Sequence, residues 1–435
     1  MIDGSIPAPD PVVGSGVDTL LRSHGDDLDR LVREHLGELR SFRRTLHAHP
    51  ELSGQEYWTT EEIAERLRVE GLDPRVLPSG TGLVCDLDLG PGDGAEGADG
   101  AAAGPVRTVV LRADIDALAM EDEKAVPYRS RVPGVAHACG HDVHTAVVLG
   151  AGLVLLGMRD GLGLTGRVRL VFEPSEETVP GGAVEVLGTG WFDGVDAVYA
   201  VHCDPKLDVG HLGVRVGAMT AASDSFELRL HGPGGHTARP QLTVDLVSVA
   251  AEVIRGLPAA LTELAEPYGE VSLVFGAVHS GDAANVIPAS AVLRGSIRTP
   301  YREVWDVTEE LLEKAVAAVV GPTGAGWSLS HVRGVPPVVN EPRATAVLAD
   351  AGRALLGPDR VVETPRSMGG DSFAWYLEDT PGSYARLGVH GPDNGADRLD
   401  LHAANFDVDE DCLAHGVRVL VTAALAELSG LRDTR

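Results

Sequence analysis

The feature that most constrains the fold is an alternation of Val- and Leu-rich strands with helices, which is interrupted once. Strands are predicted in "GLVCDLDLG", "RTVVLRADID", "RVRLVFEP" and "DAVYAVHC", and helices over about 144–158 and 182–188 lie among them. Such alternation is typical of an α/β sheet, whose functional groups gather at strand ends and in the loops beyond them. The chemistry of the chain is therefore expected at one edge of such a sheet.

The alternation is interrupted by a different pattern. Strand "SDSFELRLHG" is followed by a helix over 245–257, strands "EVSLVFGAVHS" and "AVLRGSIRT", a helix over about 303–320 and strand "GWSLSHVRG". This β-α-β-β-α-β order is that of a ferredoxin-like sandwich. We therefore predict an α/β catalytic domain over residues 25–216 and 335–435, with a mixed central sheet flanked by helices, interrupted by an α+β domain over 217–334.

Two segments are expected to lack fixed structure. Residues 1–24 begin with "MIDGSIPAPDPVV", whose Pro and Asp content predicts a disordered tail that precedes an amphipathic helix over 28–46. The segment "PGDGAEGADGAAAGP" has no large side chains and buries too little apolar surface to order itself. Residues 90–105 are therefore predicted to be a flexible insertion at the tip of a hairpin formed by the strands on either side.

Composition excludes several classes of protein. The formal net charge of −28, without a basic stripe, argues against nucleic acid as a partner. No apolar run approaches the roughly 20 residues that cross a bilayer, and the N-terminus lacks the features of a signal peptide. The four cysteines are widely spaced, which indicates a reducing compartment. A cytoplasmic location is predicted.

The stretch "HACGHDVHT" concentrates groups that handle metals and protons. Cys139 and His141 are two residues apart, and His144 follows one helical turn later. His and Cys are common ligands of zinc-like ions. This stretch alone leaves three hypotheses open: a metal site, a thiol nucleophile with its base, or a His-rich helix start capped by Asp142. His137 and His144 are each expected to be structural rather than ligands.

Further acidic and imidazole groups follow the neighbouring strands. In "FEPSEET", Glu176 and Glu177 stand at a strand end, so that one could bind a metal while the other takes a proton from water. His202 ends the next strand in "VHCDP", and His402 precedes the last helix. Asp116 in "RADIDAL" could orient a ligand or bridge two ions, whereas the neighbouring aspartate in that motif can equally be a turn residue. These groups suffice for two metal ions.

The inserted domain contributes two further candidates. His236 follows two glycines in "HGPGGHTARP", where a loop histidine could donate a hydrogen bond to a developing oxyanion. Arg298 lies on a strand in "NVIPASAVLRGSIRT", and a guanidinium can hold a carboxylate through two hydrogen bonds. An arginine at the surface of a sheet is the more common case.

The order of these motifs resembles the two-metal N-acyl-amino-acid amidohydrolases. This family includes hippurate hydrolases and enzymes that split auxin–amino-acid conjugates, within the wider aminoacylase and carboxypeptidase-G-like group. The resemblance runs from about Arg43 to Asp411 and rests on eight motifs: "LHAHPELSGQE", "RADIDALAMEDE", "GVAHACGHDVHT", "FEPSEE", "VHCDP", "GPGGHTARP", "NVIPASAVLRGSIRT" and "LHAANFDVDED".

The resemblance implies a role for each candidate residue. It implies two divalent ions (Zn, Mn, Co or Ni) held by five ligands: Cys139, His141, Glu177, His202 and His402. Glu176 would be the general base for metal-activated water, with Asp116 also in the catalytic site. His236 and Asn285 would reach the site of a partner subunit and stabilise the oxyanion, and Arg298 would hold the substrate carboxylate.

The resemblance also implies a reaction and an assembly. The inserted domain would be a lid that pairs two subunits into a homodimer. The reaction would cleave the amide bond of an N-acyl amino acid to a carboxylic acid and a free amino acid; a dipeptidase or N-carbamoyl-amino-acid hydrolase on the same scaffold is the alternative. Ala119, Gln241 and Ser372 depart from the family pattern. They leave the ligands and the base intact and bear on the substrate instead.

Overall fold

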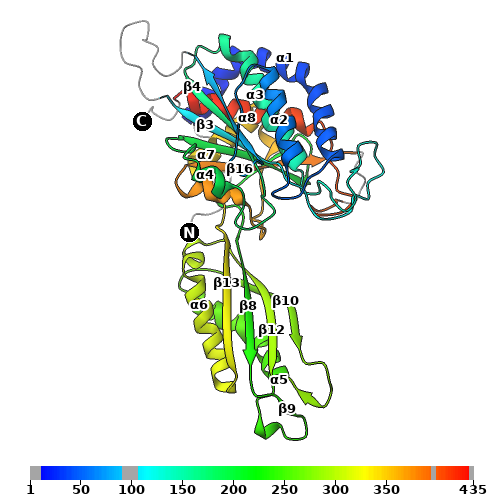
Figure 1. The fold of residues 1–435 in the computed structure, drawn as a ribbon. Helices are drawn as coiled ribbons and strands as arrows, with labels where there is room; N and C mark the ends of the chain where they lie inside the picture. The colour runs from blue at the N-terminus through cyan, green and yellow to red at the C-terminus, as the bar shows by residue number, and fades with distance from the viewer. Residues whose placement is uncertain (1–10, 91–105, 393–397, 431–435) are drawn as a thin grey trace. The chain divides into compact units, whose positions relative to one another are not determined.

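The chain forms two compact units. A computed structural model describes residues 11–90, 106–392 and 398–430. The second unit comprises Ala218–Val338 and Arg366–Ala374, and the rest of the described chain forms the first (Figure 1). The predicted insert was 217–334, and the short stretch 366–374 was not foreseen. Its backbone joins the start of the second unit, where Ser367 N donates to Met219 O at 2.9 Å.

An eight-stranded mixed sheet is the centre of the first unit. Its spatial order is β1 (Arg75–Val76), β2 (Leu83–Leu89), β4 (Gly166–Glu173), β3 (Thr108–Asp114), β5 (Ala197–Asp208), β16 (Gly382–His390), β6 (Leu212–Val214) and β15 (Val361–Glu363). The neighbours β4, β3, β5 and β16 run parallel to one another. Their carboxyl ends therefore meet at one edge of the sheet, which we call the carboxyl edge. This arrangement confirms the predicted fold class.

Strands β2 and β3 do not form the predicted hairpin. Strand β4 lies between them, paired antiparallel with β2 and parallel with β3. All seven residues of β3 are buried, as expected for a strand with a neighbour on each side. An apolar strand pattern does not specify the order of neighbours, and proximity in sequence was the wrong guide here. Residues 91–105 of the predicted insertion lie outside the described part of the chain.

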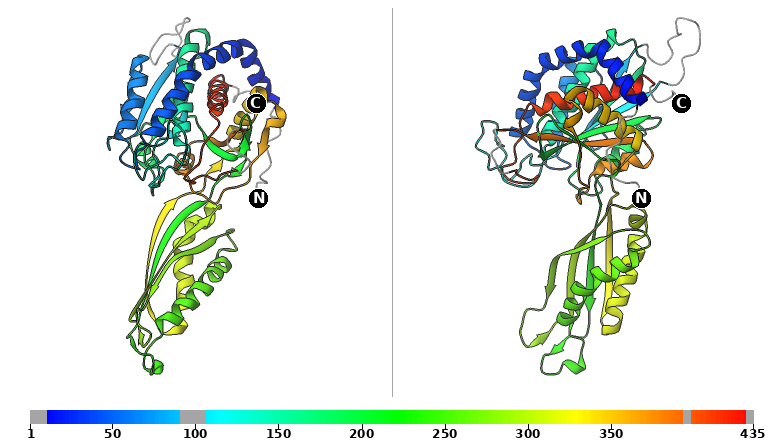
Figure 2. Two further views of the ribbon diagram at one scale, coloured as in Figure 1. Left: turned by 90° about the vertical axis from the view of Figure 1, so that its right-hand side faces the viewer. Right: turned by 180° about the vertical axis from the view of Figure 1, so that it is seen from behind.

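Helices cover the sheet in layers (Figures 1 and 2). Helices α3 (His141–Met158), α7 (Pro342–Leu356) and α8 (Cys412–Leu428) pack on one face, and α1 (Pro11–Ala48) lies across them. Helix α2 (Tyr57–Val69) packs against β2, and α4 (Ala183–Gly188) follows β4. The stretch 141–161 is long and apolar enough to span a membrane, contrary to our expectation. Because 89% of its apolar window is buried inside the protein, it is a core helix.

The N-terminal helix begins much earlier than predicted. Helix α1 starts at Pro11, so the prediction of a disordered tail is wrong for residues 11–24, while residues 1–10 lie outside the described part. Proline fits the first helical position, where its missing N–H costs nothing. Apolar side chains at helical spacing bury this segment and outweigh the poor helix propensity of its Gly and Asp residues: Val13, Val17 and Leu20.

The second unit is a four-stranded antiparallel sheet with two helices. The order is β10 (Ser272–Ser280), β12 (Ser290–Thr299), β8 (Ala222–His231) and β13 (Gly326–Val335), packed against α5 (Leu246–Ala265) and α6 (Arg302–Val320). The chain order is the predicted β-α-β-β-α-β. Short ladders join β9 (Gly235–His236) to β11 (Val286–Ile287) and β7 (Gly217–Ala218) to β14 (Val339–Asn340).

A buried arginine links the helices behind the sheet. Arg43 on α1 is 1% exposed, and its Nε lies 2.7 Å from Asp142 Oδ2 at the start of α3. Its Nη atoms lie 3.3 Å from Asp407 and 3.4 Å from Glu410, which both precede α8. Burial lowers the pKa of Arg43, but Asp142 and Asp407 outweigh burial and raise it. The guanidinium therefore neutralises carboxylates that have little access to water.

We predict that Arg43→Leu lowers the free energy of unfolding by about 3–5 kcal/mol, because it leaves a buried carboxylate without its partner. Arg30→Leu on the same helix is the matched control, since Arg30 is 50% exposed and pairs with Asp27 and Glu34, which are exposed too. Urea denaturation should show little change for the control. Equal losses in the two variants would contradict the account.

Candidate metal centre

The predicted ligands come together at the carboxyl edge. Asp114 pairs in register with Glu173, and Arg112 with Ala200, so His202 on β5 lies level with the ends of β3 and β4. Within the part of the chain that the structure describes, potential ligand atoms form four overlapping groups, in each of which all atoms lie within 4.8 Å of one another. Three of the groups join all five predicted ligands to the predicted base: Cys139–His141–His202, Cys139–Glu177–His402 and His141–Glu176–Glu177.

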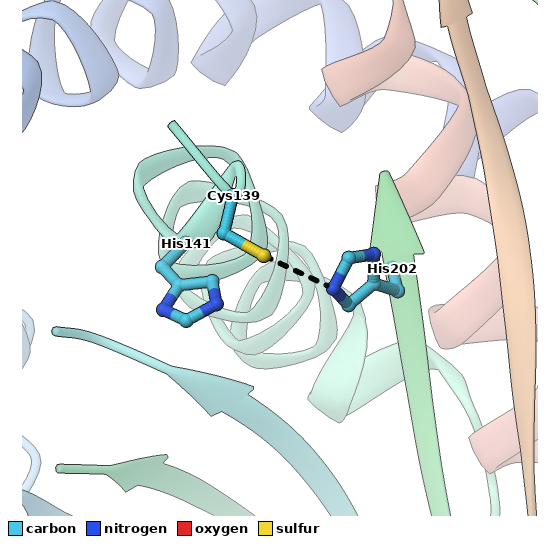
Figure 3. Close-up of side chains that lie close together, drawn as sticks. All are labelled: Cys139, His141 and His202. Atoms are coloured by element: carbon cyan, nitrogen blue, oxygen red, sulfur yellow. Dashed lines mark hydrogen bonds between the residues drawn. The ribbon is translucent and has the colours of Figure 1, made fainter. Parts of the chain in front are cut away.

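Gly140 sets the relative positions of the first two predicted ligands, Cys139 and His141. It has a φ of 92°, which favours glycine, and it occupies the N-cap of α3. A Cβ there would lie 2.7 Å from Cys203 Sγ. The chain turns sharply at this residue, so that Cys139 in the preceding loop and His141 in the first turn of α3 face the same space as His202 (Figure 3).

Hydrogen bonds orient two of the ligand imidazoles. His141 Nδ1 lies 2.9 Å from Asp116 O and 3.1 Å from Asp116 Oδ1, while its buried Nε2 has no hydrogen-bond partner among the described residues. His202 Nδ1 donates to Cys203 O at 2.8 Å, which leaves Nε2 to accept from the Cys139 thiol at 3.6 Å (Figure 3). Both rings thus direct Nε2 toward the site, as metal-binding histidines do.

His144 is structural, as expected, because both of its ring nitrogens are already bonded. Nδ1 donates to Asp114 Oδ1 at 2.6 Å, and Nε2 accepts from Cys203 N at 2.9 Å. Asp114 is fully buried and also accepts from Arg112 Nη1 at 2.7 Å. The interpretation of Asp114 as a simple turn residue is therefore wrong. It holds His144, and through His144 the backbone beside His202.

Asp142 does not cap α3, contrary to one of the three hypotheses. Gly140 is the N-cap, and Asp142 Oδ2 instead lies 2.7 Å from His47 Nδ1 and 2.7 Å from Arg43 Nε. The remaining histidine of the motif, His137, is buried, and neither of its ring nitrogens has a hydrogen-bond partner among the described residues. Burial lowers the pKa of His137 to about 3, so this ring is neutral.

Two residues at the site adopt strained backbone conformations. Among the described residues other than glycine, only Ser175 (φ 56°) and His402 (φ 64°) have positive φ. Such conformations cost about 1–3 kcal/mol and persist where the surroundings enforce them. Ser175 N donates to Glu56 Oε1 at 2.7 Å, and His402 N donates to Ala138 O at 2.8 Å. The strain therefore falls on one predicted ligand, His402, and on the residue before the paired glutamates.

The paired glutamates take different positions. Glu177 Oε1 is buried without a hydrogen-bond partner among the described residues, 3.2 Å from His402 Nε2 and 3.8 Å from His141 Nε2. Glu176 Oε2 lies 4.0 Å from His141 Nε2. Asp116 Oδ2 accepts from Glu177 N at 2.9 Å, so Asp116 orients both a ligand histidine and this turn. Glu177 thus belongs to two of the ligand-atom groups and Glu176 to one.

Electrostatics keep protons on several predicted ligands. Burial lowers the pKa of His141, but Asp114 and Cys139 outweigh burial and raise it well above its ordinary value. The Glu177 carboxylate, whose Oε1 lies 3.2 Å from His402 Nε2, raises the pKa of His402. Burial raises the pKa of the Cys139 thiol. A nucleophilic cysteine needs a lowered pKa, so the hypothesis of a thiol nucleophile finds no support here.

The residues present fit a divalent transition-metal cation. Imidazole nitrogen, thiolate sulfur and carboxylate oxygen are the donors that such ions prefer. His141 Nε2 and Glu177 Oε1 are buried polar atoms without a hydrogen bond among the described residues, and each such atom costs about 1–3 kcal/mol. A cation between them would satisfy both.

Three predicted residues belong to the second unit. His236 on β9 pairs with β11, and Thr237 N donates to Asn285 O at 3.3 Å, so His236 and Asn285 lie at the same two-stranded ladder. Arg298 lies near the far end of β12, where Nη1 donates to Met368 O at 2.8 Å. The structure thus does not bring Arg298 beside the other two, and the roles of all three stay predictions.

Residues 110–426 match the model of peptidase family M20/M25/M40. The chain belongs to this family. The crystal structure of Bacillus subtilis YXEP protein, described as a dinuclear metal-binding peptidase from the M20 family, is 30% identical with a TM-score of 0.76, over 91% of this chain and 99% of that one. This M20 chain is therefore a metal-dependent amidohydrolase, as the resemblance implied.

Two curated relatives show different coverage. N-acetyl-L-cysteine deacetylase of Bacillus subtilis (strain 168) is 34% identical, over 100% of this chain and 97% of its own length. A Rhodococcus jostii (strain RHA1) protein that carries the name glutamate--cysteine ligase 2-3 is 44% identical over 90% of this chain. The M20 chain spans only 47% of that second relative, about half of its length.

Sequence reasoning missed the buried charges behind the ligands. Arg112 Nε lies 2.7 Å from Glu173 Oε2 and its Nη1 lies 2.7 Å from Asp114 Oδ2. Tyr376 OH donates to the same Glu173 oxygen at 3.1 Å. The available signal was a charged residue inside an otherwise apolar strand, in "TVVLRAD" and "RVRLVFE". Such a residue needs a buried partner.

We predict that metal binding releases protons and weakens as the pH falls. A cation needs Cys139 as thiolate and His141 and His402 with a free ring nitrogen, yet the pKa of each is raised in the folded chain. Apparent affinity should therefore fall by about tenfold per pH unit for each proton displaced. Isothermal titration calorimetry in buffers of different ionisation enthalpy measures this release. Binding near neutral pH that releases no proton would contradict the ligand assignment.

Proposed function

We propose that this M20 amidohydrolase cleaves the amide bond of N-acyl amino acids, releasing a carboxylic acid and a free amino acid. The observation that carries the proposal is that the two adjacent glutamates differ in their neighbours: Glu177 belongs to two of the ligand-atom groups, whereas Glu176 belongs to one, with Oε2 4.0 Å from His141 Nε2. A carboxylate there can move protons while its neighbour Glu177 binds a cation. A cytoplasmic location fits this activity and is part of the proposal.

In this proposal five residues hold two divalent ions, Zn, Mn, Co or Ni: Cys139, His141, Glu177, His202 and His402. The two ligand groups Cys139–His141–His202 and Cys139–Glu177–His402, which share the thiol, support a pair of adjacent ions. When bound, such ions supply a nucleophile at neutral pH and polarise the amide carbonyl.

The protein's own residues would handle the protons. Glu176 takes a proton from the attacking water as the C–O bond forms, and it gives that proton to the amine nitrogen as the C–N bond breaks. Asp116 holds the Nδ1 side of His141 and the amide of Glu177, so that the ligands keep their orientation through both steps. Glu176 is then both the general base and the acid that protonates the leaving group. The proton taken from water ends on the released amine, so the carboxylate is regenerated.

For the second unit we propose the roles of lid and homodimer contact. His236 Nδ1 accepts from Ala238 N at 3.0 Å, so the neutral ring carries its proton on Nε2 and can donate to an oxyanion. Asn285, beside the same two-stranded ladder, would assist, in the partner subunit's site. Burial lowers the pKa of Arg298, and such a desolvated guanidinium suits a substrate carboxylate.

The names of the relatives suggest which acyl amino acids to test. One relative of nearly equal length is an N-acetyl-L-cysteine deacetylase, so N-acetyl-L-cysteine belongs among the substrates. The panel also contains N-benzoyl and longer N-acyl amino acids. Dipeptides and N-carbamoyl amino acids represent the alternative functions on the same scaffold.

We predict that chelator abolishes release of free amine from this panel and that added Zn, Mn, Co or Ni restores it. Glu176→Gln should lower kcat by about 10²–10⁴-fold while the bound metal stays unchanged. Glu185→Gln is the matched control, because Glu185 Oε1 accepts from Ser79 N at 2.7 Å instead. Full rate after chelation, or in Glu176→Gln, would contradict the mechanism. Preference for dipeptides or carbamoyl compounds would favour the alternative.

A further inference from the structure

The motif "LHAHPELSGQE" contains a buried carboxylate that the mechanism does not use. Glu56 stands just before α2 and is fully buried. Its Oε1 accepts from Ser175 N at 2.7 Å, across 119 residues of sequence. We propose that Glu56 is a positioning residue that fixes the turn carrying Glu176 and Glu177. This inference rests on the proposed function of Glu176.

Glu56 is not needed to cap α2. Its side chain makes no capping hydrogen bond to that helix. Glu51 does this instead, with Oε1 accepting from Trp58 N at 3.1 Å and Oε2 from Thr59 N at 2.8 Å. The side chain of Glu56 is therefore free to serve the turn at Ser175.

The bond acts on a strained part of the backbone. Ser175 has a φ of 56° and precedes the two glutamates directly. A buried hydrogen bond is costly to lose because the freed amide stays unsatisfied, and it can hold a conformation that an L-residue rarely adopts. Gly54 packs close to the same turn, because a Cβ on it would lie 3.7 Å from Ser175 Oγ.

The same motif holds the other side of the turn. Ser53 Oγ donates to Asp116 Oδ2 at 2.7 Å, and that oxygen also accepts from Glu177 N at 2.9 Å. The peptide unit before Ser175 is thus fixed by Glu56, and the one after Glu176 by Asp116. Residues 53–56 therefore hold both ends of the segment that bears the proposed base.

Burying Glu56 at this position costs free energy that an apolar residue would not. Its Oε2 is buried and has no hydrogen-bond partner among the described residues. Burial raises the pKa of Glu56 to about 7, against its backbone hydrogen bonds, which lower it. An apolar residue of similar volume would escape this cost. The bond to Ser175 is the feature that such a residue could not reproduce.

The test compares two conservative variants. Glu56→Gln keeps an acceptor oxygen at the same reach, whereas Glu56→Asp keeps the charge but withdraws it by one methylene. With full metal occupancy, Glu56→Asp should lower kcat by about a hundredfold, as a misplacement near 1 Å can, with little change in KM. Glu56→Gln should keep kcat within about threefold of wild type. The Ser175 amide should exchange hydrogen faster in Glu56→Asp only.

The control is Glu51→Gln, which weakens the start of α2 without touching Ser175. We expect it to lower the melting temperature and leave kcat nearly unchanged. The inference is overturned if Glu56→Asp keeps full kcat, if Glu56→Gln loses as much as Glu56→Asp, or if Glu51→Gln loses kcat equally. Full rate in Glu176→Gln would instead overturn the proposed function, so the two failures are distinguishable.

Discussion

The burial of charge behind the carboxyl edge is the constraint on which the rest of the first unit depends. A desolvated carboxylate costs several kcal/mol unless a partner compensates it. Arg112 lies between Asp114 and Glu173, and Arg43 neutralises Asp142. These pairs are not the reactive groups, yet they adjoin them: Asp114 bonds the ring next to His202, and Asp142 follows His141 in α3. The buried ion pairs thus hold the segments that carry the predicted ligands His141 and His202.

The backbone adds a second level of control. Three turns at the site use conformations that most residues avoid, at Gly140, Ser175 and His402. Each one directs a ligand, or the paired glutamates, toward the same space. Distant segments hold the last two turns, since Glu56 Oε1 accepts from Ser175 N and Ala138 O accepts from His402 N. Strained backbone of this kind lowers stability and is concentrated at functional sites, where a fixed geometry is needed.

Much of this architecture could be predicted from the sequence. The spacing of hydrophobic residues indicates the helices and strands, and the polar residues that follow the strands indicate the candidate site. The ligand set emerged from residue types at strand ends together with the family resemblance. What failed depends on information that is not local. The position of β4 between β2 and β3 does not follow from apolar strands, and the helix from Pro11 depends on burial against other helices. The partners of Arg112 and Glu56 are set by tertiary contact alone.

The central claim is that Cys139 and the neighbouring imidazoles bind the catalytic cation, with the thiol as ligand rather than nucleophile. X-ray absorption spectroscopy of the zinc-loaded protein tests it most directly. We expect a sulfur shell at about 2.3 Å together with imidazole scattering, and loss of the sulfur shell in Cys139→Ser. A fully loaded wild-type protein whose zinc has only nitrogen and oxygen neighbours would contradict the account.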